Sequence, residues 1–537
     1  MPHSPQRAET LDELGRGETW DLVVIGGGAT GLGVALDAVA RGYRTLLLEA
    51  VDYGKGTSSR STKLIHGGVR YLARGELRLV WEALHERGRL VRNAPRSVRP
   101  LSFLVPCETW GKRLYYGAGL RLYDYLSGSL RIGRTKWRTA VELERLAPAL
   151  KREKLLGAYQ YWDAQFDDAR FAVLLLRNIE RRGGRCVNHC RVVGLLSRRG
   201  KTGGVLVRDT LEGREIEVPA RVVINAAGPF ADEIRRMEDP AAPARVLLSR
   251  GAHLVLPAAG FPEDVGVLVP RTRDGRVLFA LPWWGRTLVG TTDVPQAELD
   301  WEPAVSEEEF EYLDAHLRRY LPGLEARAAL SRFAGLRPLV AAGDAGGARG
   351  GTAAVSRDFA VEVSRKGLVS VLGGKWTTYR LMAEAAVARA AEAGGLPCRP
   401  AGTRNLRLEP ESLSGTLGWD MDPAWDPAEV RDLLAAEPGL LAPLHERLPY
   451  SWLALAAGVR WEQAQTVEDL LARRTRSLLL DAAAAVEAAP AVARWLARRL
   501  ERAEDWAEEE LHRFLQVARV YLGVERTEPG RGGESVD

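Results

Sequence analysis

The sequence predicts an α/β protein, with a Rossmann-type dinucleotide-binding domain near its start and a separate α-helical domain at its end. Two observations predict this architecture. A glycine-rich turn lies between a β-branched run and a helical pattern within the first 50 residues, and strand signals disappear after about residue 402, where Leu, Ala, Glu and Arg dominate. A length of 537 residues allows about three domains.

The composition excludes several classes of protein. Apolar residues make up 46% and charged residues 27% of the chain, which is ordinary for a globular protein and argues against disorder. The net charge of +5 is too small for its length to indicate a nucleic-acid binder. Arginine (66) greatly outnumbers lysine (9), as it does in proteins of thermophiles and in those from GC-rich genomes.

The cysteines indicate a reducing compartment. Four cysteines are too few for a disulfide framework. Cys186, His189 and Cys190 lie close together, but no second ligand pair accompanies them, so buried or incidental thiols are favoured over zinc and no metal site is expected. No stretch reaches the ~20 apolar residues of a membrane span, and residues 1–20 lack the apolar core of a signal peptide. We therefore expect a cytoplasmic protein whose membrane contact is peripheral.

The first elements form a strand–turn–helix–strand unit. Residues 1–19 are polar and are expected to form a loose tail. Residues 21–25 are β-branched and predict a strand, residues 26–31 a turn, and residues 32–40 a helix that stops near Gly42. Residues 45–48 predict the second strand.

The rest of the chain before residue 400 mixes helices and strands. Helical patterning covers residues 76–92, 171–182 and 306–320, and short strands are expected over residues 186–224 and 244–295. The segment that follows, GLVSVLGGKWTTYRLMAEAAVARAAEAGG, reads as a strand, a glycine turn and a long helix.

These elements predict a division of the chain into domains. We expect a nucleotide-binding domain within residues 20–400, interrupted by a substrate-binding domain at roughly residues 95–160 and 242–345. The helical domain is expected at 402–525, and residues 526–537 form a second polar tail.

The glycine turn carries the strongest chemical signal. Gly26, Gly28 and Gly31 fit the G-x-G-x-x-G pattern, and Glu49 ends the next strand. Gly26 permits the tight turn, Gly28 lets the backbone approach a pyrophosphate, and Gly31 allows close helix–strand packing, while Glu49 would bind a ribose hydroxyl. The alternative is a purely structural glycine-rich turn. Because FAD and NAD both use this motif, it does not identify the cofactor alone.

Further segments predict the rest of a cofactor site. After Glu49 comes the stretch GTSSRSTKLIHGGVRYL, whose hydroxyls and glycine amides suit a phosphate and a flavin ring. VVINAAGP lets the chain pass close to the adenine half, and GGKWTT places a second helix start near the cofactor. The candidate residues in these segments are Thr57, Ser58, Ser59, Ser61, Lys63, His66, Gly67, Ala226, Gly228, Gly374 and Thr378.

The order of the motifs resembles one known family. DLVVIGGGATGLG, TSSRSTKLIHGGVRYL, INAAGPFAD, GTTD, GLRPL, SRDF and GGKWTTYR occur in the order seen in FAD-dependent, respiratory glycerol-3-phosphate dehydrogenases, and VEDLLARRTRSLLLDA resembles that family's helical cap. The resemblance runs over residues 21–523. It implies a glutathione-reductase-type FAD domain, a mixed-sheet α+β substrate domain and electron delivery to a membrane quinone.

The resemblance also implies a cationic substrate site. Its motif positions are Arg70, Tyr71, His253, Arg337, Arg357 and Lys375. A guanidinium fork binds phosphate with two hydrogen bonds, so we assign the phosphate to Arg70 and Arg357, helped by Lys375 or Tyr71. We place the candidate catalytic residues His253 and Arg337 near the reacting C2 hydroxyl, with Lys375 also a candidate. Taken alone, each arginine reads as a solvated surface residue and His253 as a structural histidine.

The implied reaction is hydride transfer from C2 of glycerol 3-phosphate to FAD, with His253 the preferred base and dihydroxyacetone phosphate the product. Three alternatives remain: a glycerol-3-phosphate oxidase that reduces oxygen, an amine or amino-acid oxidase, and a non-catalytic flavoprotein. The oxidases of this family usually carry an extra insertion, and no long one is evident here. An amine oxidase would not need this many cations.

A quinone-reducing enzyme without a membrane span must dock on the bilayer surface. Residues 110–126, WGKRLYYGAGLRLYDYL, combine aromatic, apolar and basic side chains and are the preferred docking segment. The basic residues 87–99 are a second candidate. Aromatic-rich segments are more often buried, so a core segment or a homodimer contact remains the alternative for 110–126.

Overall fold

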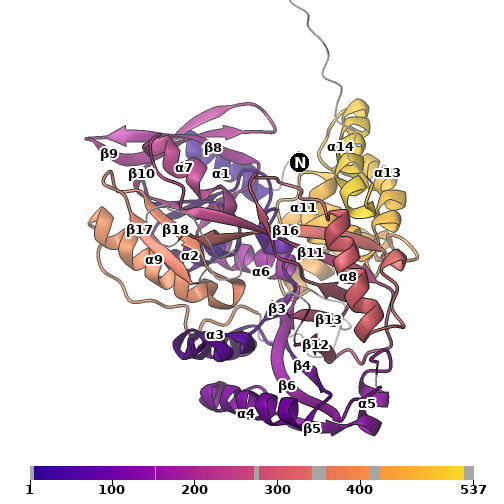
Figure 1. Ribbon diagram of the computed structural model, residues 1–537. Coiled ribbons are helices and arrows are strands. Elements are labelled where there is room, and N and C mark those ends of the chain that lie inside the picture. Colours follow the sequence, from indigo (N-terminus) through magenta and orange to yellow (C-terminus); the bar gives the residue numbers. More distant parts are fainter. Residues whose placement is uncertain are drawn as a thin grey trace, which may run out of the picture.

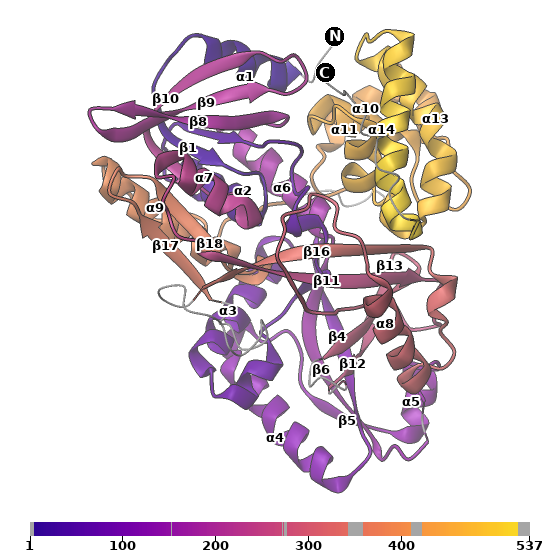
Figure 2. The same cartoon turned by 45° about the horizontal axis from the view of Figure 1, so that its top comes forward.

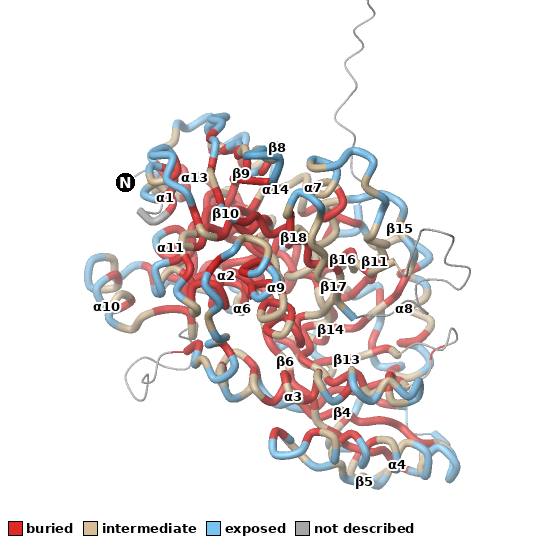
Figure 3. The backbone as a smooth tube through the Cα atoms, turned by 90° about the vertical axis from the view of Figure 1, so that its left-hand side faces the viewer, coloured by how far each residue is buried: buried red, intermediate tan, exposed pale blue. Residues whose placement is uncertain are grey.

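The computed structural model describes residues 5–151, 153–270, 272, 277–341, 358–409 and 422–524, without the side chain of Arg70. Two large sheets and a layer of C-terminal helices make up the molecule (Figures 1 and 2). The buried backbone is concentrated in the sheets and in the helices between them (Figure 3).

The first sheet is the dinucleotide-binding sheet. Its strand order is β17-β18-β10-β1-β2-β7, and all neighbours are parallel except β17, which pairs antiparallel with β18. Its strands are β1 (Trp20–Ile25), β2 (Thr45–Leu48), β7 (Arg185–Val187), β10 (Glu215–Asn225), β17 (Phe359–Val363) and β18 (Val369–Gly373).

Different layers cover the two faces of this sheet. One face packs against helices α2 (Ala29–Ala40), α6 (Asp168–Glu180) and α9 (Tyr379–Gly394) in one apolar cluster. The other packs against the antiparallel strands β8 (Cys190–Arg198) and β9 (Lys201–Asp209), which extend from β10. Burial on both faces explains why these strands are near-continuous apolar runs.

The first residues are not a loose tail. Helix α1 spans Pro5–Gly15 and packs Leu11 and Leu14 into the cluster on the β9 side of the sheet. Arg7 is fully buried and donates to Asp209 Oδ1 at 2.9 Å. The prediction of a polar tail is wrong for this segment, because the partner that makes its charge acceptable lies far away in sequence.

The second sheet is mixed and lies beside the first. Its order is β15-β11-β14-β13-β12-β4-β6-β3, with β16 paired to β11 and β5 to β6; β12 is parallel to β4 and the other pairs are antiparallel. Its strands are β3 (Leu64–Ile65), β4 (Val98–Cys107), β5 (Lys136–Thr139), β6 (Gly157–Phe166), β11 (Val246–Leu256), β12 (Val265–Val269), β13 (Leu278–Trp283), β14 (Arg286–Gly290), β15 (Val294–Gln296) and β16 (Ser331–Val340).

Four helices surround the second sheet. Helices α3 (Leu77–Asn93) and α4 (Trp110–Leu126) lie at the end of the molecule opposite the C-terminal helices, as Figures 1 and 2 show. Helices α5 (Ala140–Leu146) and α8 (Glu307–Tyr320) pack on the remaining strands through a separate apolar cluster. Both have a capping box, at Thr139 and Ser306, which satisfies their first amides.

The C-terminal region is helical. Within residues 422–524 there is no strand, and the one β-type pairing is an isolated bridge between Pro443 and Ser451. Its helices are α10 (Pro427–Ala436), α11 (Trp452–Trp461), α12 (Ser477–Leu480), α13 (Ala482–Arg499) and α14 (Glu504–Leu522); α7 (Ala231–Glu238) belongs to the nucleotide-binding domain. No helix in the described ranges combines the length and apolar character needed to cross a bilayer.

A buried ion-pair cluster joins the helical region to the nucleotide-binding domain. Arg474 donates to both carboxylate oxygens of Asp52 at 2.8 and 2.7 Å, and Arg473 contacts the same carboxylate. Both arginines come from a π-helical turn, Asp469–Arg474, and all three side chains are buried. Burial would raise the pKa of Asp52, but Arg474 and Arg473 outweigh it and hold this pKa well below its usual range.

We expect Asp52→Asn to lower the free energy of unfolding by about 3–5 kcal/mol, because it removes the one carboxylate that two buried guanidinium groups share. Chemical denaturation of the purified protein measures the change. Glu509→Gln is the control, since its pair with Arg513 is exposed and should contribute less than about 1 kcal/mol. Equal effects of the two substitutions would contradict this account of the cluster.

Candidate functional site

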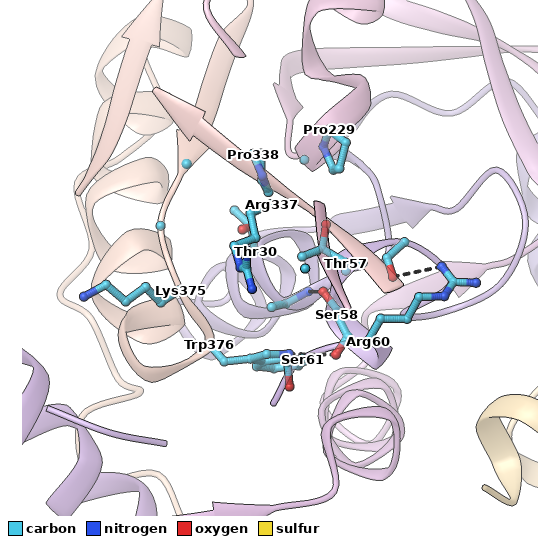
Figure 4. A pocket seen from close by; sticks show the side chains of 18 of the residues that line it. Thr30, Thr57, Ser58, Arg60, Ser61, Pro229, Arg337, Pro338, Lys375 and Trp376 are labelled. Carbon is cyan, nitrogen blue, oxygen red and sulfur yellow. Dashed lines mark hydrogen bonds between the residues drawn. The ribbon is translucent and has the colours of Figure 1, made fainter. Parts of the chain in front are cut away.

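A single large cavity collects most of the predicted site residues in the described part of the chain. It extends from the carboxyl ends of β1 and β2 to strands β11 and β16 of the second sheet, and Figure 4 shows part of its lining. The predicted residues that line it are Gly26, Gly28, Glu49, Thr57, Ser58, Ser61, His66, Tyr71, Ala226, Gly228, His253, Arg337, Gly374 and Lys375.

The glycine turn has the geometry that a dinucleotide site requires. Gly26 has a φ of 108°, which favours glycine. A Cβ atom on Gly31 would lie 1.8 Å from the carbonyl oxygen of Gly26, so α2 meets β1 more closely than any side chain allows. Gly28 caps α2 and lines the cavity, which leaves the first amides of this helix near the position of a bound anion.

Glu49 holds this turn while it lines the cavity. Its carboxylate accepts from the backbone N–H groups of Gly27 at 2.5 Å and Val51 at 2.9 Å. Burial raises its pKa, and the two backbone donors oppose that rise. The acidic side chain is therefore fixed at the end of β2, where the fingerprint motif expects a ribose.

The serine-rich loop closes one wall of the cavity. Ser58 Oγ accepts from the Ala29 N–H at 2.9 Å, at the start of α2, and the Ser58 carbonyl accepts from Trp376 Nε1 at 2.8 Å. Thr377 Oγ1 accepts from the His66 N–H at 3.2 Å. Three motifs that lie far apart in the sequence are thus hydrogen-bonded around one cavity.

Lys63 lies behind the cavity instead of lining it, which corrects the expected direct cofactor contact. Its ammonium donates to Asp168 Oδ2 and to the Ser59 carbonyl, both at 2.7 Å, and its side chain is fully buried. Burial lowers the pKa of Lys63 to about 8, against the opposing effect of Asp168. Its φ of 61° is unusual for a residue other than glycine, and these bonds hold it there.

Four other predicted cofactor residues also lie behind the lining, and two phosphate candidates are not described. Gly31, Ser59, Gly67 and Thr378 support their loops without facing the cavity. Ser59, for example, binds Lys63 and Arg476 through its carbonyl. Arg357 and the side chain of Arg70 lie outside the described residues.

Two neighbours hold the His253 ring in place. The ring stacks on Phe333 at a centroid distance of 4.9 Å, and its Nε2 lies 3.0 Å from Thr62 Oγ1. The Thr62 hydroxyl can donate to Nε2 or accept from it, so either neutral tautomer fits. Burial, and then the charges of Arg337 and Lys63, lower the pKa of His253 well below its usual range, which keeps the ring neutral at pH 7.

Arg337 is oriented by the GTTD segment. Its Nη2 donates to Thr291 Oγ1 at 2.7 Å and to the Thr292 carbonyl at 3.1 Å. Asp293 lies 3.6 Å from its other amino group. A Cβ atom on Gly251 would lie 2.1 Å from this guanidinium, so the glycine of the neighbouring strand makes room for it.

Lys375 precedes the short helical turn at 376–378 and lines the same cavity. Its ammonium lies 4.6 Å from the centre of the Tyr71 ring, within cation–π distance. In Figure 4 its side chain extends away from Thr57 and Ser58, whereas Arg337 stands over the centre of the view. Tyr71 and Lys375, the two residues expected to assist at the phosphate, are therefore in contact with each other and line the same cavity.

Sequence reasoning missed several lining residues. Thr291 and Thr292 line the cavity, although the GTTD motif in which they lie predicts no role for them, whereas Thr62 belongs to the stretch whose hydroxyls are expected to line the cofactor site. Asp163 and Trp301 also line the cavity, and no local pattern singles them out. Their positions depend on which strands and loops meet across the cavity.

Comparisons with known proteins agree with this geometry. The model of a family described as FAD dependent oxidoreductase matches residues 21–380, and that of the C-terminal domain of alpha-glycerophosphate oxidase matches residues 428–510. The mitochondrial glycerol-3-phosphate dehydrogenases of Mesocricetus auratus and Homo sapiens are 37% and 36% identical to the chain, over 99% of its length and 77% of theirs.

Solved structures show the same fold. A glycerol-3-phosphate dehydrogenase from Bacillus halodurans, complexed with FAD, has a TM-score of 0.74 and 28% identity, and the match covers 97% of this chain and 99% of that one. L-alpha-glycerophosphate oxidase from Mycoplasma pneumoniae, with FAD bound, has a TM-score of 0.56 at 17% identity, over 73% and 98% of the two chains. At that identity the second likeness shows the fold alone.

We expect the flavin to be bound without a covalent link. Cys190 is the cysteine among the described residues that line the cavity, and it lies near Glu49. Burial raises its pKa to about 12, so its side chain remains a thiol at neutral pH. Acid precipitation of the yellow protein should therefore release the flavin into the supernatant. Flavin that stays with the pellet would contradict the expectation, and Cys190→Ser should release the same fraction as the unchanged protein.

Proposed function

The chain belongs to the family of FAD-dependent glycerol-3-phosphate dehydrogenases, and we propose that it oxidises sn-glycerol 3-phosphate to dihydroxyacetone phosphate and passes the electrons to a membrane quinone. One observation carries the proposal: an intact dinucleotide-binding turn and cationic side chains of the second sheet line the same cavity. The turn supplies Gly26, Gly28 and Glu49, and the second sheet supplies His253 and Arg337.

The residues present fit FAD. The Gly26–Gly28 turn and the start of α2 suit the pyrophosphate, and Glu49 suits a ribose hydroxyl. The serine loop and His66 line the part of the cavity that leads to His253. FAD, when bound, supplies the acceptor for two electrons and the C2 hydrogen.

The charges of the second sheet suit a small phosphorylated alcohol. We assign the phosphate to Arg70 and Arg357, on the strength of their motif positions, with Lys375 or Tyr71 assisting. Arg337 is fixed by Thr291 and Thr292, so its orientation is set before substrate binds. A preoriented guanidinium beside the reacting carbon would stabilise negative charge on the C2 oxygen as its proton leaves.

His253 is the residue we propose as the base. It lines the cavity, and its lowered pKa keeps the ring neutral and able to accept the C2 hydroxyl proton. With FAD bound, the C2 hydrogen would leave with its electron pair to the cofactor, the alcohol would become a ketone, and the hydroxyl proton would remain on His253. Thr62 and Phe333 hold the ring in the plane that this transfer requires.

We expect Arg70→Ala or Arg357→Ala to lower the apparent affinity for glycerol 3-phosphate about tenfold or more, because a charge-assisted hydrogen bond contributes roughly 1.5–3 kcal/mol. Oxidation of plain glycerol should hardly change. Arg→Lys at either position should also be costly, since the guanidinium fork is lost. Steady-state kinetics with both alcohols tests this, and equal losses for the two substrates would refute the phosphate assignment.

The second element of the proposal is the identity of the electron acceptor, a quinone. An oxidase that reduces oxygen is the competing function, because the C-terminal segment matches the model of the corresponding domain of alpha-glycerophosphate oxidase. Anaerobic reduction of the enzyme by glycerol 3-phosphate, followed by mixing with a quinone analogue or with oxygen, separates the two. Reoxidation that is fast with oxygen and slow with the quinone would overturn the quinone proposal.

We propose that α4 is the surface that docks on the membrane, on the inner face of the cell membrane. Its outward side chains include Trp110 at 69%, Leu114 at 77%, Tyr115 at 62% and Tyr125 at 80% exposure, an unusual cluster for a surface without a partner. Arg113 and Arg121 lie on the same helix, beside these aromatics. Aromatic and apolar side chains with flanking cations suit an anionic lipid interface.

The inward side of the same helix reaches the cavity wall. The Tyr123 hydroxyl donates to Asp163 Oδ1 at 2.7 Å and accepts from the Gly67 N–H at 2.8 Å. Asp163 lines the cavity, and Gly67 lies between two residues that do. Docking through α4 would therefore bring the flavin-side wall near the lipid that contains the quinone.

We expect the triple variant Leu114→Ala, Tyr115→Ala, Tyr125→Ala to bind anionic liposomes at least about tenfold more weakly, because each removed side chain loses roughly 1 kcal/mol or more of apolar burial. Co-sedimentation with the FAD-loaded protein measures binding. The control is Val141→Ala, Leu441→Ala, which removes exposed apolar side chains elsewhere. Unchanged liposome binding by the triple variant, with an altered oligomeric state in sedimentation velocity, would instead make α4 a homodimer contact.

A further inference from the structure

One loop of the second sheet crosses to the nucleotide-binding domain. Residues 297–305, between β15 and α8, have no regular secondary structure. The Trp301 ring stacks on the Phe230 ring at a centroid distance of 4.0 Å and an interplanar angle of 19°. Phe230 belongs to the turn that follows β10, and both rings line the cavity. The stack therefore joins the two domains across the wall of the cofactor cavity.

The next residue forms an ionic link to the opposite wall. Glu302 is 5% exposed, and its Oε1 accepts from both Lys55 Nζ and Arg60 Nη2. Lys55 and Arg60 belong to the serine-rich loop and line the cavity themselves. The Glu302 N–H donates to Asp300 Oδ1 at 2.8 Å, which tightens the loop at this point.

The C-terminal helices reinforce this link. Tyr521 of α14 donates its hydroxyl hydrogen toward Glu302 Oε2 at 3.3 Å, and it accepts from Arg60 Nε at 3.3 Å. Lys55 also contacts Glu468, which precedes the π-helical turn, at 2.5 Å. Residues from the second sheet, the nucleotide-binding domain and the helical region thus meet at one buried carboxylate.

We propose that residues 297–305 form a strap that retains FAD, with Trp301 and Glu302 as its two fastening points. We expect FAD to pass this strap when it enters or leaves, because the strap contacts both the turn after β10 and the serine-rich loop, which line the cavity. Opening it separates the Trp301–Phe230 stack and leaves Glu302 without Lys55 and Arg60, and both changes are unfavourable in a buried setting. The strap sets how long FAD stays bound and contributes nothing to the chemistry at His253. This inference rests on FAD being the cofactor, but not on the identity of the substrate.

The test measures FAD release from the holoenzyme. Each variant is diluted, and free flavin is separated from protein by gel filtration at successive times. We expect Trp301→Ala and Glu302→Gln each to release FAD at least tenfold faster than the unchanged protein. Glu298→Gln, an exposed acidic residue of the same loop, is the matched control and should release FAD at the original rate.

A second set of variants separates retention from folding. Trp301→Phe keeps an aromatic ring and should release FAD at a rate between those of the unchanged protein and Trp301→Ala. Phe230→Ala combined with Trp301→Ala should accelerate release no more than either change alone, because both break the same stack. Unchanged release in Trp301→Ala and Glu302→Gln would overturn the proposal.

The result is independent of the proposed reaction. FAD release is followed without substrate, so a strap that behaves as expected would stand even if glycerol 3-phosphate failed to reduce the flavin. Conversely, normal reduction by glycerol 3-phosphate with unchanged FAD release in every variant would leave the proposed function intact and remove the strap.

Discussion

The structure depends on neutralising the charges that one buried loop carries. Residues 49–63 connect the second strand of the dinucleotide-binding sheet to the second sheet, and they bury Glu49, Asp52, Lys55, Arg60 and Lys63. A buried charge without a partner is strongly unfavourable. Glu49 is held by backbone N–H groups, and the other four charges form ion pairs with residues elsewhere in the fold. The partners come from every other part of the molecule: Arg473 and Arg474 from the helical region, Glu302 from the strap, and Asp168 from α6. The loop that lines the cofactor cavity is therefore also the place where the domains are joined.

This arrangement lets each domain contribute one kind of chemistry. The dinucleotide-binding sheet supplies backbone amides at the start of α2 and a fixed carboxylate at Glu49, which suit the phosphates and ribose of a nucleotide. The second sheet supplies side chains that are held by their neighbours, with His253 between Thr62 and Phe333. Glycines make the side-chain geometry possible, since a Cβ on Gly290 would lie 2.3 Å from the His253 ring. No residue that the structure describes in the helical region lines the cavity. This region contributes by holding the loop in place through its ion pairs with Asp52.

The sequence predicted what local patterns determine and missed what distant contacts determine. The glycine turn, the first two strands and most helices follow from periodicity and from residues a few positions apart. The dense motif around Lys63 predicts a contact with the cofactor. Its position is instead set by the ion pair with Asp168, 105 residues away in the sequence. The polar composition of residues 5–15 predicts a tail, yet Arg7 pairs with Asp209, which is 202 residues away in the sequence. No sequence pattern singles out Trp301, because its role depends on stacking against Phe230 in another domain.

Helix α4 shows how the same constraint extends to the surface. Its inner face is fixed by a polar contact, since Tyr123 lies between Asp163 and the Gly67 amide, and Arg87 of α3 donates to Asp163 at 2.8 Å. A buried network of polar hydrogen bonds holds a helix in one orientation more strictly than apolar packing does. The outer face is thereby obliged to present Trp110, Leu114 and Tyr125 together to the surroundings. An apolar face fixed in this way costs free energy in water, and that cost is offset when the face enters a lipid interface. The contacts that support the flavin-side loop thus also fix the orientation of the surface that we propose for membrane docking.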